Sequence, residues 1–157
     1  MPPRSYRALG LALVLFGLVA SSASADTTIA CDPCSYPYQQ WVDEARVPTP
    51  DRTVPVTEAE DLTMSCGSPA LACTDGNTVW IESWAFSHKP SFLHELGHIF
   101  ALEHPALAAF TDERFAFAYS LCARLVRIDP RWHYTGPRPG FQGRALLATC
   151  AAIRRSS

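Results

Sequence analysis

The chain has 157 residues, with 13 basic and 15 acidic side chains and a formal net charge of −2. No run of Lys or Arg stands out, so the sequence lacks the electrostatic footprint of a nucleic-acid-binding protein or of a protein that binds anionic membranes. Its length leaves room for one domain with one core, and hardly for two.

The first 25 residues have the features of a secretory signal peptide. Two arginines precede an apolar run at residues 8–20, and the small residues that end at Ala25 form a suitable cleavage site. The run is too short for an ordinary membrane-spanning helix, and no later segment is long or apolar enough. We therefore expect a secreted protein without a stable membrane anchor, in which residues 26–157 form a single domain.

All six cysteines follow the expected cleavage site. An even number in an exported chain indicates disulfides, although sequence alone does not fix the pairing. Local geometry favours a bond that closes a turn and a second that joins two helices, which leaves one closely spaced pair. The expected pairs are Cys66–Cys73, Cys122–Cys150 and Cys31–Cys34. For the last pair, the alternative is a redox or zinc motif. The sequence has no second cysteine pair at zinc-knuckle spacing to support it.

Short elements are predicted before the central helix. Apolar residues at helical spacing indicate a short amphipathic helix within residues 35–46. Three prolines then predict an extended or looped segment over residues 47–60. Turn signals follow at residues 67–69 and 75–77, and the β-branched and aromatic residues of 78–82 predict a strand.

A helix is predicted from Pro90 to about Glu103, with Ser91 as its N-cap and Pro105 as its stop. Apolar residues occupy nearly its whole circumference, which is typical of a helix buried on all sides. Two histidines and a glutamate inside such a helix need partners, because unpaired polar groups in an apolar interior cost several kcal/mol.

Residues 94–98 read His-Glu-Leu-Gly-His, which is the HExxH pattern. Residues i and i+4 lie one above the other on a helix, so His94 and His98 can bind one metal ion. Zn²⁺ accepts neutral imidazole nitrogen at about 2.0–2.1 Å, and Glu95, beside that face, can take a proton from water without being a ligand. The alternative is two core histidines bonded to backbone carbonyls.

A second helix is predicted from Thr111, its cap, to about residue 127, where Asp129 and Pro130 end it. One of its faces can meet the metal-binding helix and carries Glu113, Ala116, Phe117 and Ser120. A loop rich in Pro and Gly follows, and residues 144–155 are predicted to form a last helix.

A catalytic zinc ion usually takes three protein ligands, and two candidates for the third follow the motif. His104 nearly completes the metzincin pattern HExxHxxGxxH. However, Ala101 replaces the glycine that turns the chain there, and no methionine follows for a Met-turn. Glu113 is the candidate that we favour, and His104 is the alternative.

With Glu113 as a ligand, the chain resembles the gluzincins, HExxH zinc metallopeptidases whose third ligand is a glutamate on a later helix. Ala116 fits the small residue of their ExxAD pattern. Phe117 departs from it, because the family usually has an acid there that supports a zinc-binding histidine. Possible substitutes for that acid are Asp112, Glu82 or a backbone carbonyl. The resemblance covers about residues 78–124 and is strongest in 94–98.

This resemblance implies a small α+β, zincin-like domain with a short sheet, a buried HExxH helix, a later helix that bears the glutamate, and stabilising disulfides. It implies a secreted zinc peptidase, a hydrolase that attacks peptide bonds with metal-activated water and Glu95 as general base. An extended peptide or protein substrate would pair with residues 78–82 as a sheet edge, and the alternative is that this strand only covers the helix core. His133 or Tyr134 would assist the oxyanion, with Tyr119 and His88 as alternatives. A zinc-binding but inactive domain that binds a partner is the second hypothesis, and a disulfide-stabilised binding protein without metal is the third.

Overall fold

The computed structural model describes residues 27–67, 70–84, 88–127 and 143–156. The expected signal peptide lies outside these ranges, and so does the expected loop with His133 and Tyr134. Within them, no helix combines the length and the hydropathy that crossing a membrane requires.

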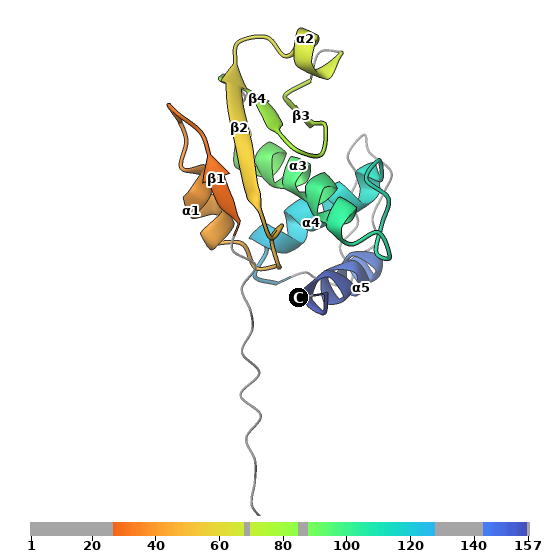
Figure 1. Ribbon diagram of the computed structural model, residues 1–157. Helices are drawn as coiled ribbons and strands as arrows, with labels where there is room; N and C mark the ends of the chain where they lie inside the picture. The colour runs from red at the N-terminus through yellow and green to blue at the C-terminus, as the bar shows by residue number, and fades with distance from the viewer. Residues whose placement is uncertain (1–26, 68–69, 85–87, 128–142, 157) are drawn as a thin grey trace, which may run out of the picture.

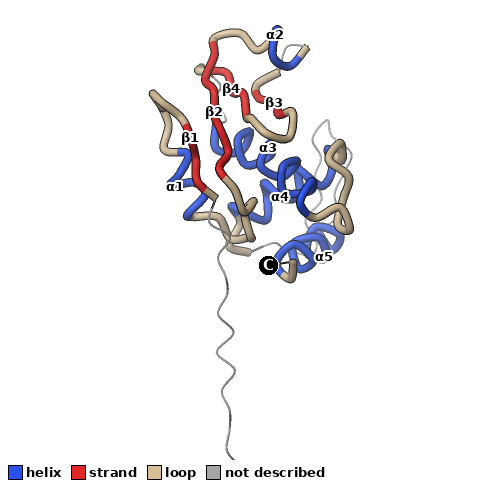
Figure 2. Tube along the Cα trace, viewed as in Figure 1, coloured by secondary structure: helices blue, strands red, loops and turns tan. Residues whose placement is uncertain are grey.

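The described chain folds into a small α+β structure with a four-stranded sheet and five helices (Figures 1 and 2). The strands are β1 (Thr28–Ala30), β2 (Thr53–Ala59), β3 (Ala72–Thr74) and β4 (Val79–Glu82). The helices are α1 (Tyr38–Asp43), α2 (Thr63–Cys66), α3 (His88–Glu103), α4 (Glu113–Arg124) and α5 (Gly143–Arg154). Figure 1 shows α1 beside β1 and α5 on the side of α4 away from the sheet.

The strand order in the sheet is β1-β2-β4-β3, with β1, β2 and β4 parallel and β3 antiparallel to β4. β2 pairs with β1 through residues 53–55 and with β4 through residues 56–59. Pro55, which has no N–H to donate, therefore lies where only β1 is its neighbour. The segment predicted as extended or looped thus contains a strand, in which Val54 and Val56 are buried and alternate with exposed residues.

The predicted strand at residues 78–82 is confirmed as β4, but the expectation that it is a sheet edge is wrong. β4 lies between β2 and β3, and β3 is the edge. The turn at residues 75–77 explains the difference, because it folds the chain back into a hairpin. There the Asp75 carboxylate accepts hydrogen bonds from the backbone N–H groups of Asn77 (2.8 Å) and Thr78 (2.9 Å), and Gly76 has a φ of 92°.

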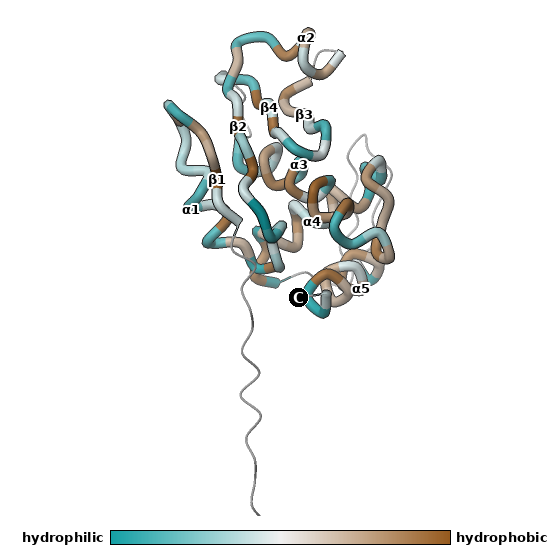
Figure 3. Tube along the Cα trace, in the orientation of Figure 1, coloured by the Kyte–Doolittle hydropathy of each residue, from teal (hydrophilic) through white to brown (hydrophobic). Residues whose placement is uncertain are grey.

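α3 runs through the centre of the molecule and is buried as predicted. All ten residues from Phe92 to Ala101 are buried, and hydrophobic stretches follow the helix in Figure 3. Its apolar side chains pack against the inner face of β2 and β4, where Val54, Val56, Val79 and Ile81 are buried. Each large side chain removed from water here contributes about 1.5–3 kcal/mol to folding.

The ends of three predicted helices differ from the structure. α1 is shorter than the predicted range 35–46. α3 begins at His88, so Ser91 lies inside the helix and is not its N-cap. α4 is capped by Asp112, whose carboxylate accepts from the backbone N–H of Arg114 and Phe115 (both 3.0 Å), and not by Thr111. A carboxylate is a stronger acceptor than a hydroxyl and also suits the positive end of the helix dipole.

All six cysteines lie in described residues, and they pair as predicted. The pairs are Cys31–Cys34, Cys66–Cys73 and Cys122–Cys150, with Cα–Cα distances of 5.5, 5.8 and 5.4 Å. The second pair joins α2 to β3, and the third joins α4 to α5. Disulfides are typical of proteins in oxidising compartments.

Candidate metal centre

Three side chains from α3 and α4 form a group that can hold a metal ion: His94, His98 and Glu113. The Nε2 atoms of the two histidines are 3.2 Å apart. One Glu113 oxygen lies 3.2 Å from Nε2 of His94, and the other lies 3.4 Å from Nε2 of His98. Two imidazole nitrogens and a carboxylate therefore converge on one point, as the HExxH spacing predicts.

Both histidines are buried, whereas the Glu113 side chain is 68% exposed. The centre thus has one buried side, on α3, and one open side, at the start of α4. Keeping the carboxylate on the solvent side limits the cost of removing its charge from water.

The backbone carbonyl of Phe110 orients His98. Nδ1 of His98 lies 2.6 Å from that oxygen, so Nδ1–H donates and the proton is fixed on this nitrogen. The Nε2 lone pair then points to His94 and Glu113 and is free to bind a cation. This carbonyl performs the task for which Asp112 and Glu82 were the other candidates. Asp112 caps α4 instead.

Close packing of α3 on α4 sets the distance between the ligands. A Cβ on Gly97 would lie 2.9 Å from the Cα of Ala116 and 2.9 Å from the Cβ of Tyr119. At the start of α3, the Ser120 hydroxyl donates to the Pro90 carbonyl at 2.9 Å. The glycine inside the motif therefore lets α4 approach closely enough for Glu113 to reach the histidines, with Ala116 as the predicted small residue at the contact.

His104, the alternative third ligand, lies elsewhere. Because α3 continues to Glu103 without a glycine turn, the His104 ring stacks on Phe100 with 4.0 Å between ring centroids. Its Nδ1 lies 3.1 Å from the Phe100 carbonyl, and its Nε2 lies 3.2 Å from the Ser156 carbonyl. Among the described residues, the group that could hold a metal ion contains Glu113 and does not contain His104.

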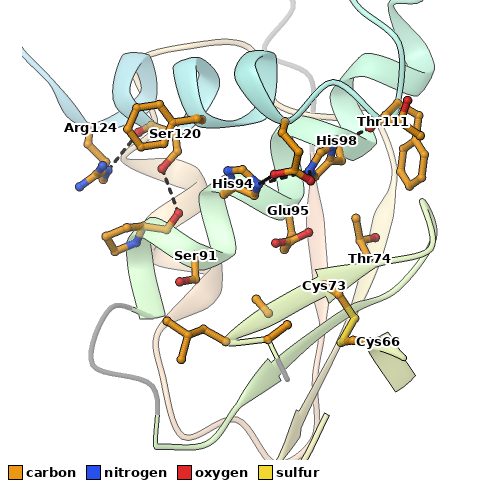
Figure 4. A pocket seen from close by; sticks show the side chains of 17 residues that line it. Cys66, Cys73, Thr74, Ser91, His94, Glu95, His98, Thr111, Ser120 and Arg124 are labelled. Atoms are coloured by element: carbon orange, nitrogen blue, oxygen red, sulfur yellow. Dashed lines mark hydrogen bonds and ion pairs between the residues drawn. A yellow bond between two sulfur atoms is a disulfide. The ribbon is translucent and has the colours of Figure 1, made fainter. Parts of the chain in front are cut away.

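The metal-binding group lies in a cleft of about 790 Å³ between the two helices and the strand edge. Glu95 is buried and projects from α3 toward the strand that carries Cys73 and Thr74 (Figure 4). The strand side of the cleft consists of Cys66 and residues 70–74, including all of β3. A carboxylate beside a metal-binding group, opposite a strand edge, is thus present.

The predicted oxyanion donors do not reach this cleft in the described residues. His133 and Tyr134 lie outside the described ranges. Tyr119 is fully buried and donates from its hydroxyl to the Pro48 carbonyl (2.8 Å), and burial, followed by the Glu103 charge, raises the pKa of its phenol. His88 stacks on Tyr36, with ring centroids 3.7 Å apart, and is not among the residues that line the cleft.

Three features of the cleft were not identified in the sequence: which backbone carbonyl supports His98, the β3 edge, and Arg124, which lines one end. A backbone carbonyl leaves no sequence signal. β3 has three residues, too few for an alternating pattern. Arg124, however, is placed on the Glu113 face of the helix by its spacing, since it follows Ser120 by four residues.

Comparisons with protein-family models, with curated proteins and with solved structures find no match to this chain. The functional interpretation therefore depends on the geometry of the cleft and on the HExxH residues within it.

Proposed function

We propose that this chain is a secreted zinc-dependent peptidase of gluzincin type, in which His94, His98 and Glu113 bind the metal ion and Glu95 is the general base. The convergence of the three donor groups is the observation that carries the proposal. In tetrahedral zinc sites with bonds of about 2.0–2.1 Å, neighbouring ligand atoms are about 3.3–3.4 Å apart. Here the two imidazole Nε2 atoms are 3.2 Å apart, and each lies near a different Glu113 oxygen, at 3.2 and 3.4 Å, while one ligand atom from each residue can be chosen within 4.8 Å of the others.

The chemistry of the donor set also supports zinc. Two neutral imidazoles and one carboxylate form a common catalytic zinc set, which leaves a position for water. A cation between the two Nε2 atoms, which are 3.2 Å apart, would accept a lone pair from each neutral imidazole. When bound, zinc supplies Lewis acidity, which polarises a carbonyl and lowers the pKa of water.

In this mechanism, Glu95 moves the proton. Its carboxylate is buried beside the ligand face, so it takes a proton from the attacking water and returns it to the leaving amine. The Phe110 carbonyl keeps the proton of His98 on Nδ1 throughout. Burial of these groups keeps bulk water from competing for their hydrogen bonds.

The edge of β3 is the element best placed to hold an extended peptide. β3 pairs with β4 on one side only, and its residues line the cleft opposite the HExxH helix. A peptide added to this edge would be held through its backbone, which tolerates many side chains. The expectation that a strand presents the substrate thus moves from residues 78–82 to residues 72–74.

The test is the substitution Glu95→Gln, with Glu103→Gln on the same helix as a control outside the cleft. We expect the zinc-loaded E95Q variant to keep one zinc ion per chain by elemental analysis and to lose at least about a hundredfold in kcat on a quenched-fluorescence peptide library. E103Q should cleave at the wild-type rate. Equal cleavage by the E95Q variant and the wild type would overturn the mechanism.

A zinc-binding but inactive domain is the second candidate function, and one observation favours it. Phe117 lines the cleft where gluzincins usually have an acid, so the described part of this wall contributes an aromatic ring instead. Under this hypothesis, the wild-type protein binds one zinc ion and cleaves no member of the library.

A further inference from the structure

Arg124 lies at the end of the cleft beyond Ser120, on the last turn of α4 (Figure 4). Its side chain is half-buried, and its Nε–H donates to the Ser120 carbonyl at 3.0 Å. Among the ion pairs between described residues, none involves Arg124. Burial lowers the pKa of its guanidinium, so the surroundings remove water without supplying a counter-charge.

The charges along the cleft are arranged in two groups. Both carboxylates of its described lining, Glu95 and Glu113, lie at the metal-binding group, and the single Arg or Lys of that lining is Arg124. Near the guanidinium the described lining is neutral, with Pro90, Ser91, Phe117 and Ser120. A guanidinium in such a place favours a carboxylate ligand, because its planar N–H groups can donate two parallel hydrogen bonds.

We propose that Arg124 binds a carboxylate of the peptide that occupies the cleft, and so selects acidic substrates. This inference rests on the proposed peptidase function for its substrate class. The carboxylate can belong to an Asp or Glu side chain or to a free C-terminus, and both offer the same pair of oxygens.

Helix geometry gives the position of this carboxylate in the peptide. Glu113 and Ser120 are separated by about 10 Å along α4, at about 1.5 Å per residue. Arg124 folds back by one turn to the Ser120 carbonyl, so its guanidinium lies near that level. An extended chain rises about 3.3 Å per residue, so the carboxylate lies about three residues from the scissile bond.

The binding test uses zinc-loaded protein carrying Glu95→Gln, which removes turnover from the measurement. Fluorescein-labelled octapeptides of neutral sequence would carry one Glu, Gln or Lys at each position in turn, each with a free or an amidated C-terminus. We expect Glu at one position to lower the Kd roughly tenfold or more relative to Gln. If a terminal carboxylate is the ligand instead, the peptides with a free C-terminus should bind more tightly than the amidated ones, whichever residue they carry.

Adding Arg124→Gln should abolish this preference, and adding Arg124→Glu should transfer it to Lys. Arg127→Gln removes the same charge from an exposed site three residues further on and should leave the preference intact.

Melting temperatures and zinc content verify that each variant is folded and loaded. A preference for Glu that persists in R124Q, or that R127Q removes equally, overturns the proposal. Because binding is measured without hydrolysis, failure of the peptidase function would show separately, as a wild-type protein that prefers acidic peptides but does not cleave them.

Discussion

The two walls of the cleft are built in different ways. The helical wall, from α3 and α4, contains every candidate catalytic and metal-binding side chain among the described residues, and its helices touch so closely that Gly97 has no room for a Cβ. The strand wall is β3, three half-buried residues at the edge of the sheet, tied to a four-residue helix by the Cys66–Cys73 disulfide.

This difference separates two requirements of the proposed hydrolytic site. Metal ligands must be held to within a few tenths of an ångström, which close helix packing and buried hydrogen bonds achieve. A strand that adds an extended peptide needs only a free backbone edge, and in the described residues β3 pairs with β4 on one side only. The comparison predicts that changes in the helical wall remove the chemistry, whereas changes in the strand wall weaken peptide binding.

The largest effect is expected for His98→Ala, which removes one ligand from the helical wall. We expect zinc content to fall from one ion per chain to near zero, because two remaining ligands bind zinc weakly. In the wild type, zinc at a thousand times its Kd should stabilise the fold by about 4 kcal/mol, and a chelator should remove this gain. Elemental analysis measures the zinc content, and thermal melting with and without EDTA measures the stabilisation by zinc.

His104→Ala is the control for that experiment, since His104 follows the same helix and is bonded to the Phe100 and Ser156 carbonyls. It should keep zinc and the EDTA-dependent shift in melting temperature. Loss of zinc in this variant, with retention in H98A, would reverse the assignment of the ligands.

A smaller effect is expected for Gly97→Ala, which changes no ligand. The new Cβ would meet the α4 backbone at Ala116 and push the helices apart, at a cost of about 1–3 kcal/mol in unfolding free energy. Because the shift also moves Glu113 away from the histidines, zinc affinity should fall as well. Urea titration measures the unfolding free energy, and competition with a zinc indicator measures the zinc affinity. As a control, Met64→Ala, at a side chain that is 95% exposed, should change the unfolding free energy by less than about 0.5 kcal/mol. Unchanged zinc affinity in a destabilised G97A would show that helix spacing does not control the site.

The smallest effect on chemistry is expected in the strand wall, for the pair Cys66→Ser and Cys73→Ser. Opening this short loop should cost about 2 kcal/mol of stability and let β3 move. KM for peptides should rise severalfold while kcat changes little, because no group of the helical wall is affected. Cys31→Ser with Cys34→Ser removes a disulfide whose cysteines do not line the cleft and should leave KM unchanged. A fall in kcat alone for the first pair would contradict the separation of roles between the walls.

The helical wall could be predicted from the sequence to the extent that its signals are local. Two histidines four residues apart, the glutamate between them and the small residue three positions after Glu113 each follow from helical spacing, which neighbouring residues determine. The disulfide pairs were also predicted, since two of them close short segments. Helix starts were less accurate, because Thr111 and Asp112 are both good caps and their side-chain contacts decide between them.

The strand wall could not be predicted, because its geometry depends on pairing between distant segments. Residues 78–82 carry a strand signal, but nothing in them states whether β3 covers their second edge. Likewise, the hydrogen bond from His98 to the Phe110 carbonyl depends on the path of the chain between α3 and α4. Because the acceptor is a backbone carbonyl, no residue type in the sequence indicates this bond.

That return segment links two parts of the metal-binding group. Phe110 supplies the carbonyl that orients His98, and two residues later Asp112 starts the helix that presents Glu113. An insertion or deletion at this point would rotate an imidazole and displace a carboxylate together. Variation in chain length should therefore be tolerated poorly here, and a designer who wishes to change the metal preference should keep this spacing fixed.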